Sequence, residues 1–218
     1  MRLPIIKELR KREYREIASF QDMVIDLLYR TDSSIILHGG TTVWRCFSGN
    51  RFSTDIDAYL TNRINAKALK RRLSALAADY GINVEKVKDS GNLLFIGFSL
   101  NNTYLKVEIN HTLKKLNPLA TRFERVDGTF TDVLALSPEG LIAEKINAYS
   151  DRRFIRDIYD VYILSEYAKK EPDLKKKVND FLSNIAQPVD EEDLKVLIYA
   201  GPVPSFQSMV SSIKARFS

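Results

Sequence analysis

The sequence predicts an α+β protein in which a small mixed sheet, flanked by helices, is followed by an all-helical C-terminal half. Short apolar runs of strand length alternate with segments of helical periodicity up to residue 110. Asn101 and Asn102 separate two of these runs and predict a hairpin turn, because Asn tolerates the positive φ of tight turns. From Ser137 onwards every segment has helical spacing, so the strands belong to the first half of the chain.

The first half begins with a helix over residues 12–29, where apolar residues recur at helical spacing. A buried strand over 33–38 ends at two glycines, and a helix over 41–47 stops at Gly49. A second strand over 54–60 precedes an amphipathic helix over 65–80, which Gly81 ends. Three further strands are expected over 82–87, 92–100 and 103–110.

The second half follows a polar segment, 112–132, which we expect to be irregular. Ser137 as N-cap and Pro138 at the first helical position predict where the helices begin. We therefore divide the chain into an α/β core with an N-terminal helix, 1–132, and a helical domain that completes the active site, 133–218. The expected helices of this domain span 138–149, 154–169, 173–184, 190–199 and 205–217.

Composition narrows the class of protein. The chain has 218 residues, of which 44% are hydrophobic and 28% charged, which is typical of a globular protein with a real core. Cys46 is the only cysteine, so no internal disulfide can form, and a cytoplasmic location is expected. No run reaches the roughly 18 apolar residues that span a bilayer, so no membrane partner is expected. The net charge of +5 favours an anionic partner.

A pair of glycines, Gly39 and Gly40, stands between a predicted strand and a predicted helix. The free N–H groups and positive dipole of a helix N-terminus suit a phosphate, and glycine lets the backbone come close to it. Thr41 could add a hydroxyl donor. Neither a Walker loop nor a dinucleotide-binding fingerprint is present.

Two carboxylates, Asp55 and Asp57, lie two residues apart in a predicted strand and so face the same side. Carboxylate and phosphate oxygens are the ligands that Mg²⁺ prefers, and Mn²⁺ accepts the same set. Glu108 on another strand is the candidate third metal ligand, and Lys106 shares its face. An ordinary Lys–Glu couple on an exposed sheet is the alternative explanation for that second pair.

A third group of charged residues follows in the helical half. Lys145 lies on an otherwise apolar helix, where it either extends to the surface or reaches a triphosphate. Arg153, Asp157 and Asp160 follow at helical spacings that allow ion pairs. The basic cluster Arg152, Arg153 and Arg156 is a candidate contact for RNA phosphates.

Five blocks of this sequence together resemble the AbiEii/AbiGii abortive-infection toxins of the DNA polymerase β-like nucleotidyltransferase superfamily. They are Gly39-Gly-Thr, Arg51-x-Ser-Thr-Asp-Ile-Asp, Lys106-x-Glu-Ile, Glu144-Lys145 and Arg153-x-x-Arg-Asp-x-x-Asp. The resemblance covers about residues 33–165 and implies a nucleotidyltransferase core. It implies that Asp55 and Asp57 bind the metal, that Lys145 contacts the triphosphate, and that Asp157 is a further active-site acid.

The same resemblance implies a reaction and partners. Some members add nucleotides from an NTP to the 3′ end of tRNA, and in some an antitoxin phosphorylates the serine that corresponds to Ser53. Transfer to a small molecule or a protein hydroxyl is the alternative within this chemistry. A metal-dependent nuclease built on Asp57, Glu108 and Lys106 is a second alternative, but it gives the glycines and Lys145 no role. A non-catalytic RNA-binding module is disfavoured because both aspartates are intact.

Overall fold

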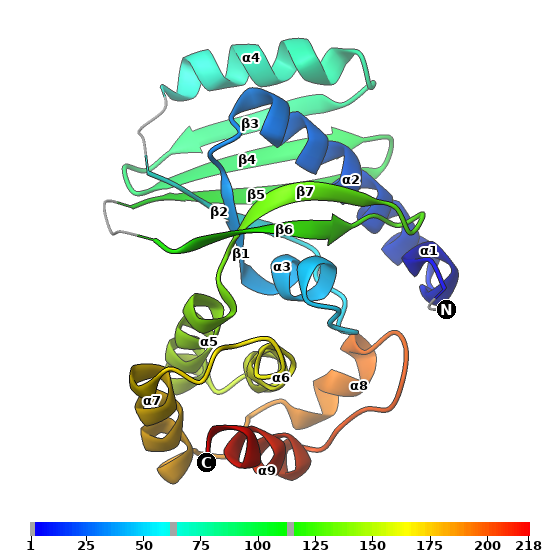
Figure 1. The fold of residues 1–218 in the computed structure, drawn as a ribbon. Coiled ribbons are helices and arrows are strands. Elements are labelled where there is room, and N and C mark those ends of the chain that lie inside the picture. Colours follow the sequence, from blue (N-terminus) through cyan, green and yellow to red (C-terminus); the bar gives the residue numbers. More distant parts are fainter. Residues whose placement is uncertain (1–2, 62–64, 113–115) are drawn as a thin grey trace.

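The computed structural model describes residues 3–61, 65–112 and 116–218. Within these ranges one seven-stranded sheet has the order β3-β4-β5-β2-β1-β7-β6 (Figure 1). Its strands are β1 (Ile36–His38), β2 (Ile56–Leu60), β3 (Asn83–Asp89), β4 (Leu93–Leu100), β5 (Thr103–His111), β6 (Pro118–Glu124) and β7 (Phe130–Leu136).

The sheet is mixed, as the sequence predicts. Strands β2 and β5 run parallel, as do β1 and β7, whereas the other four neighbouring pairs are antiparallel. The hairpin expected at Asn101 joins β4 to β5, and Asn101 adopts a positive φ of 52°. The short strand β1 lies near the centre, between β2 and β7, and leads directly into the glycine pair.

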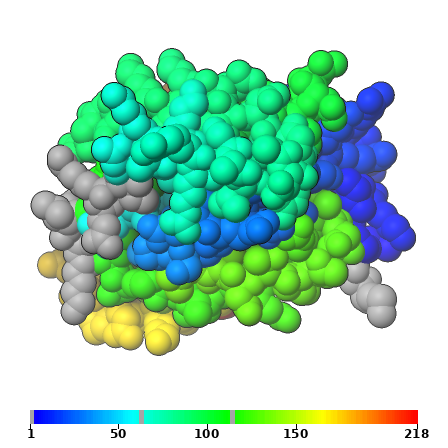
Figure 2. All heavy atoms as spheres, turned by 90° about the horizontal axis from the view of Figure 1, so that it is seen from above, coloured from blue at the N-terminus to red at the C-terminus, as the bar shows by residue number. Residues whose placement is uncertain are grey.

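Two helices, α2 (Arg12–Thr31) and α4 (Ala66–Ala78), cover one face of the sheet. Figure 2, which looks down on this face, shows α4 lying over it. Successive side chains of a strand point to opposite faces, so alternate residues of β4 and β5 point toward these helices. Ile96 and Val107 are two of them and are fully buried. The opposite face therefore carries the polar residues of β2 and β5.

Apart from α1, the remaining helices lie on the other side of the sheet (Figure 1). A second apolar cluster joins the helical half to Val43 and Phe47 of the first half and to Leu136 of β7. The helices of this side are α3 (Gly39–Cys46), α5 (Pro138–Arg152), α6 (Ile155–Leu164), α7 (Pro172–Ser183), α8 (Leu194–Leu197) and α9 (Phe206–Phe217), and a short α1 (Ile5–Glu8) opens the described chain.

The prediction of an irregular segment over 112–132 was wrong for its described residues, because β6 and the first three residues of β7 lie there, whereas residues 113–115 lie outside the part of the chain that the structure describes. β6 is an edge strand in which Phe123 alone is buried, so it lacks the apolar alternation that reveals a half-buried strand. β7 continues to Leu136, past the boundary we placed after residue 132.

The predicted helix over 190–199 was also only partly right. A 3-10 turn, Glu191–Asp193, leads into a single α-helical turn, and the chain is then extended where Ile198 bridges to Arg51. α6 ends at Leu164, five residues before the predicted end, and α3 begins at Gly39 rather than Thr41. None of the described helices has the length and apolar character that crossing a bilayer requires.

Candidate active site

The carboxylates predicted to bind metal come together at the middle of the sheet. Asp57 on β2 and Glu108 on β5 are direct register partners of two parallel strands, and Asp55 immediately precedes β2. The ammonium nitrogen of Lys106 lies 3.0 Å from a Glu108 oxygen and 3.6 Å from an Asp55 oxygen. The fold therefore gathers three acids and one lysine on a single face, where they are half-buried.

The electrostatics of this group favour a bound cation. Burial raises the pKa of Asp57, and the nearby carboxylates of Asp55 and Glu108 raise it further, whereas His38 and Lys145 act in the opposite direction. The hydrogen bond to Glu108 raises the pKa of Lys106, which keeps its positive charge among the acids. Three carboxylates on one face are a donor set that suits a hard divalent cation. Among the described residues, however, no three His, Cys, Asp or Glu side chains already stand in the geometry of a metal site.

The glycine pair packs against the site because neither residue has a side chain. Gly39 has a φ of +75°, and a Cβ there would lie 2.1 Å from a carboxylate oxygen of Asp57. A Cβ on Gly40 would lie 2.4 Å from the guanidinium of Arg51 and 2.8 Å from the hydroxyl oxygen of Ser53. Glycine is therefore required at both positions by close approach of the backbone to site side chains.

The hydroxyl of Thr41, predicted to face a phosphate, is used inside the fold. Thr41 is 2% exposed and donates its hydroxyl proton to the backbone carbonyl of Asp55. Gln21, which is fully buried on α2, donates to the backbone carbonyls of Ser53 and Thr54 at 2.9 and 3.0 Å. These bonds fix the segment that leads into β2 and so fix where Asp55 lies.

A second polar group beside Asp57 was not anticipated from the sequence. His38, the register partner of Asp57, lies 3.2 Å through Nδ1 from a carboxylate oxygen of Glu144. The hydroxyl of Tyr59 donates to the other Glu144 oxygen at 2.7 Å, and the Tyr59 and His38 rings stack 4.0 Å apart. Burial alone would raise the pKa of Glu144, but the contacts with His38 and Tyr59 outweigh it and lower that pKa. Tyr59 follows Asp57 by two residues in the predicted strand, so the sequence could have indicated that the two side chains share a face.

Lys145 is held in a buried ion cluster. Its ammonium lies 2.7 Å from Asp160 and 3.8 Å from Asp157. Arg51 forms two hydrogen bonds to Asp160, at 2.9 and 2.8 Å, and Arg152 forms two to Asp157, at 2.9 and 3.0 Å. Burial would raise the pKa of Asp160, but Arg51 and Lys145 outweigh it and lower that pKa. The helical spacing of the two acids predicted ion pairs, but Arg51, the partner of Asp160, comes from 109 residues away.

The other two arginines of the predicted cluster take different positions. Arg153 is exposed and ends α5 in a left-handed conformation with a φ of 54°. Arg156 lies over the ring of Phe154, 5.3 Å from its centroid, and its buried Nε has no hydrogen-bond partner. Arg152 lies over the same ring at 5.3 Å while it pairs with Asp157. The three arginines are thus divided between an ion pair, an aromatic contact and the surface.

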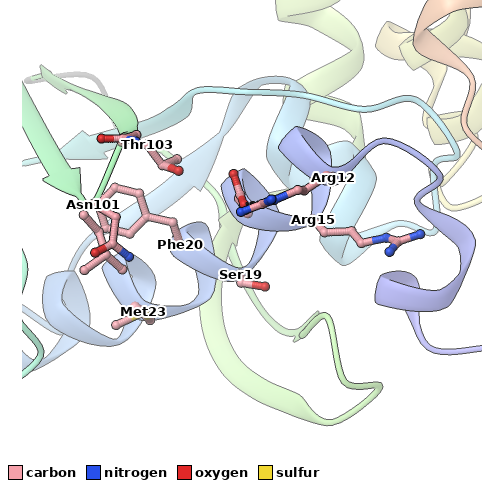
Figure 3. A pocket seen from close by; sticks show the side chains of 10 residues that line it. Arg12, Arg15, Ser19, Phe20, Met23, Asn101 and Thr103 are labelled. Carbon is pink, nitrogen blue, oxygen red and sulfur yellow. Dashed lines mark hydrogen bonds and ion pairs between the residues drawn. The ribbon is translucent and has the colours of Figure 1, made fainter.

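A separate cavity of about 510 Å³ lies between α2 and the β4–β5 turn (Figure 3). Arg12, Arg15, Phe20, Asn101 and Thr103 are among the residues that line it. Arg12 pairs with Glu16, and Arg15 donates to the backbone carbonyl of Leu9, so both guanidinium groups are engaged. None of the predicted site residues lines this cavity.

Comparisons with known proteins concern the family and the fold of the chain. A family described as the nucleotidyl transferase AbiEii toxin of type IV toxin–antitoxin systems matches residues 26–207. The crystal structure of JHP933 from Helicobacter pylori is similar, with a TM-score of 0.64 and 19% identity over 95% of this chain and 91% of that one. A candidate nucleotidyltransferase from H. pylori follows, with a TM-score of 0.59 and 19% identity over 92% of each chain.

No curated protein matches the sequence. At 19% identity the two solved structures establish similarity of fold alone. The family match extends over most of the chain, from α2 to α9, and includes every residue of the acid and ion clusters described above. The chain therefore belongs to the AbiEii family of nucleotidyl transferase toxins.

Proposed function

We propose that the protein transfers a nucleoside monophosphate from an NTP to an RNA, with the 3′ end of tRNA as acceptor, and requires Mg²⁺ or Mn²⁺. One observation carries this proposal: Asp57 and Glu108 are register partners beside Asp55, and the ion cluster of Lys145 lies close enough to affect the pKa of Asp57. Carboxylates on one side and a cation on the other form the arrangement that phosphoryl-transfer chemistry needs.

The reaction joins the RNA 3′ oxygen to the α-phosphorus of the NTP, breaks the bond from that phosphorus to the bridging oxygen, and releases pyrophosphate and the hydroxyl proton. Bound at Asp55, Asp57 and Glu108, a divalent ion would stabilise charge on the phosphates and favour ionisation of the attacking hydroxyl. Gly39 and Gly40 bring backbone N–H groups close to the phosphates, and Lys145 stabilises the negative charge that develops on the departing pyrophosphate. Asp157 and Asp160 orient Lys145 for this role.

The basic chain favours an anionic macromolecule as acceptor. Arg153 and Arg156, on the helical side of the site, are suited to bind its phosphates. The family assignment implies an antitoxin partner. Because tRNA is the proposed acceptor, we also propose that the reaction takes place in the cytoplasm.

The test is transfer of label from each of four α-³²P-labelled NTPs to total RNA in the presence of Mg²⁺, with Asp57→Asn as the matched inactive control. Label in RNA of tRNA length with wild type and none with Asp57→Asn is the expected result. Label on a small hydroxylated compound or a protein, with RNA unlabelled, would replace RNA by that acceptor. Shortening of the RNA without labelling would indicate a nuclease instead.

A further inference from the structure

The face of the sheet that carries the acids continues beyond them onto β4 and the edge strand β3. The cross-strand register places Lys88, Phe95, Glu108 and Asp57 in one row, on β3, β4, β5 and β2. The next row holds Lys86, Gly97 and Lys106, with Asp55 beside Lys106. Because register partners point to the same side of a sheet, all of these side chains share the face of the acids.

This extension is open, unlike the face beneath α2 and α4. Lys86 and Lys88 are exposed, and Phe95 is half-buried although β4 has a neighbouring strand on each side. Strands lie about 4.8 Å apart, so Phe95 stands roughly 10 Å from Asp57 and Lys88 roughly 14 Å from it. The extension begins, therefore, within about two nucleotides of the proposed reaction centre.

Tyr104 supplies a flat aromatic surface on this extension. It lies on β5 with the same parity as Lys106 and Glu108, and its side chain is laid across Gly97 of β4, where a Cβ would be 2.2 Å from the phenol oxygen. The backbone of Gly97 therefore covers one side of the Tyr104 side chain while the residue stays 52% exposed. A tyrosine fixed in this way offers a ring that is already ordered, so binding to it loses little side-chain entropy.

The charge of the extension is mainly positive. The Lys86 ammonium lies 5.8 Å from the centroid of the Phe95 ring, so cation and ring form one surface. Glu85 of β3 also belongs to this face, where its carboxylate accepts a hydrogen bond from the hydroxyl of Ser99. Glu108 lies on the same face but belongs to the active site. Lysines interleaved with aromatic rings are the pattern of surfaces that bind single-stranded nucleic acid through phosphate contacts and base stacking.

We propose that this surface, which we call the Tyr104 platform (Lys86, Lys88, Phe95, Gly97 and Tyr104), binds the single-stranded 3′ end of the acceptor RNA. Bases stack on Tyr104 and Phe95, and Lys86 and Lys88 contact phosphates. The terminal hydroxyl then lies at the edge where the platform meets Asp57. This inference rests on the proposed function, because it takes RNA as the acceptor.

The experiment uses the full chain and two separate measurements. Binding of a fluorescein-labelled single-stranded RNA ending in CCA is measured by anisotropy without NTP or metal, and label transfer to the same RNA is measured with the RNA and the NTP concentrations varied in turn. Tyr104→Ala should weaken binding about fivefold to a hundredfold, the range of one base–aromatic stack, whereas Tyr104→Phe should bind nearly as well as wild type. In transfer, Tyr104→Ala should raise the KM for RNA while the KM for NTP stays unchanged.

The lysines are tested by their salt dependence. Lys86→Ala/Lys88→Ala should reduce the log–log slope of affinity against salt by about 1.4, which is 0.7 for each lost phosphate contact on a single strand. The matched control is Lys67→Ala/Lys70→Ala, which removes the same charge from exposed positions of α4 on the other side of the sheet. The control should change the slope much less.

The outcomes separate the two proposals. RNA labelling by wild type with an unchanged KM and Kd in Tyr104→Ala and in the lysine pair overturns the platform and leaves the proposed function standing. RNA binding that Tyr104→Ala weakens, without any transfer of label by wild type, supports the platform and overturns the proposed reaction. No RNA binding by wild type overturns the platform.

Discussion

Asp160 offers the most direct test of the ion cluster beside the acids. Its carboxylate is 1% exposed and lies between two cations, with Arg51 at 2.9 and 2.8 Å and Lys145 at 2.7 Å. Asp160→Asn keeps the shape of the side chain but removes its charge. The substitution leaves a buried guanidinium and a buried ammonium facing each other, and the nearby anion that remains is Asp157, 3.8 Å from the ammonium and already paired with Arg152.

The expected cost can be derived from these contacts. Removing one partner of a buried ion pair costs about 3–5 kcal/mol, because the remaining charge is left uncompensated. In a chain of this size that corresponds to a fall in Tm of about 6–20 °C. Arg51→Met should cost less, about 1.5–3 kcal/mol, because Lys145 still neutralises Asp160 and only hydrogen bonds to a charged group are lost.

The two variants are compared with Asp180→Asn, a substitution on the exposed side of α7, by urea unfolding and thermal melting. The folded-state pKa of Asp160 lies below its unfolded value of about 3.9. Its carboxylate therefore contributes stability above about pH 4 that is lost as the pH falls, and Asp160→Asn should flatten this acid limb. A cost for Asp160→Asn no larger than that of Asp180→Asn, or smaller than that of Arg51→Met, would refute the reasoning.

Three further predictions concern the site itself. Asp57→Asn should abolish transfer. It should also raise the Tm of the metal-free protein, because burial and the neighbouring acids disfavour the Asp57 carboxylate. Full activity of this variant at saturating Mg²⁺ would disprove the metal assignment. Lys145→Ala should lower the transfer rate per folded molecule about 100-fold or more, and Lys145→Arg should restore only part of that rate. A lower Tm with an unchanged rate per folded molecule would show that Lys145 has a structural role. Ser53→Glu should block transfer because its charge stands beside Gly40 and Arg51, and Ser53→Ala should remain active in the same label-transfer assay; activity in both variants would contradict this.

Local patterns were sufficient to predict where the two aspartates and the two glycines lie in the fold. A spacing of two residues in the strand that we predicted over 54–60 already places Asp55 and Asp57 on one face, although β2 itself begins one residue after Asp55. A glycine pair between a strand and a helix already indicates close approach of the backbone. That Asp57 stands beside Glu108 depends on β5 pairing with β2, although β3 and β4 lie nearer to β2 in sequence. Local periodicity carries no information about such an order of strands.

The parts that the sequence did not reveal are the long-range polar pairs. Arg51 and Asp160 are 109 residues apart, and His38 and Glu144 are 106 apart. Each residue by itself resembles an ordinary surface charge or a core histidine, and only the fold makes its partner known. The edge strand β6 escaped prediction for a related reason, since its exposed side chains leave no apolar alternation to detect.

The helical half shares its apolar core with the sheet, because Ile36 of β1, Val43 of α3 and Leu136 of β7 pack in the same cluster as Ile142 of α5. Neither half can bury these side chains without the other. We therefore expect the two halves to melt in a single cooperative transition. In native-state hydrogen exchange, the amides of α5 and α6 should open with the same free energy as those of β1 and β2. The carboxylates and Lys145 then remain in fixed register with each other for as long as the protein is folded at all.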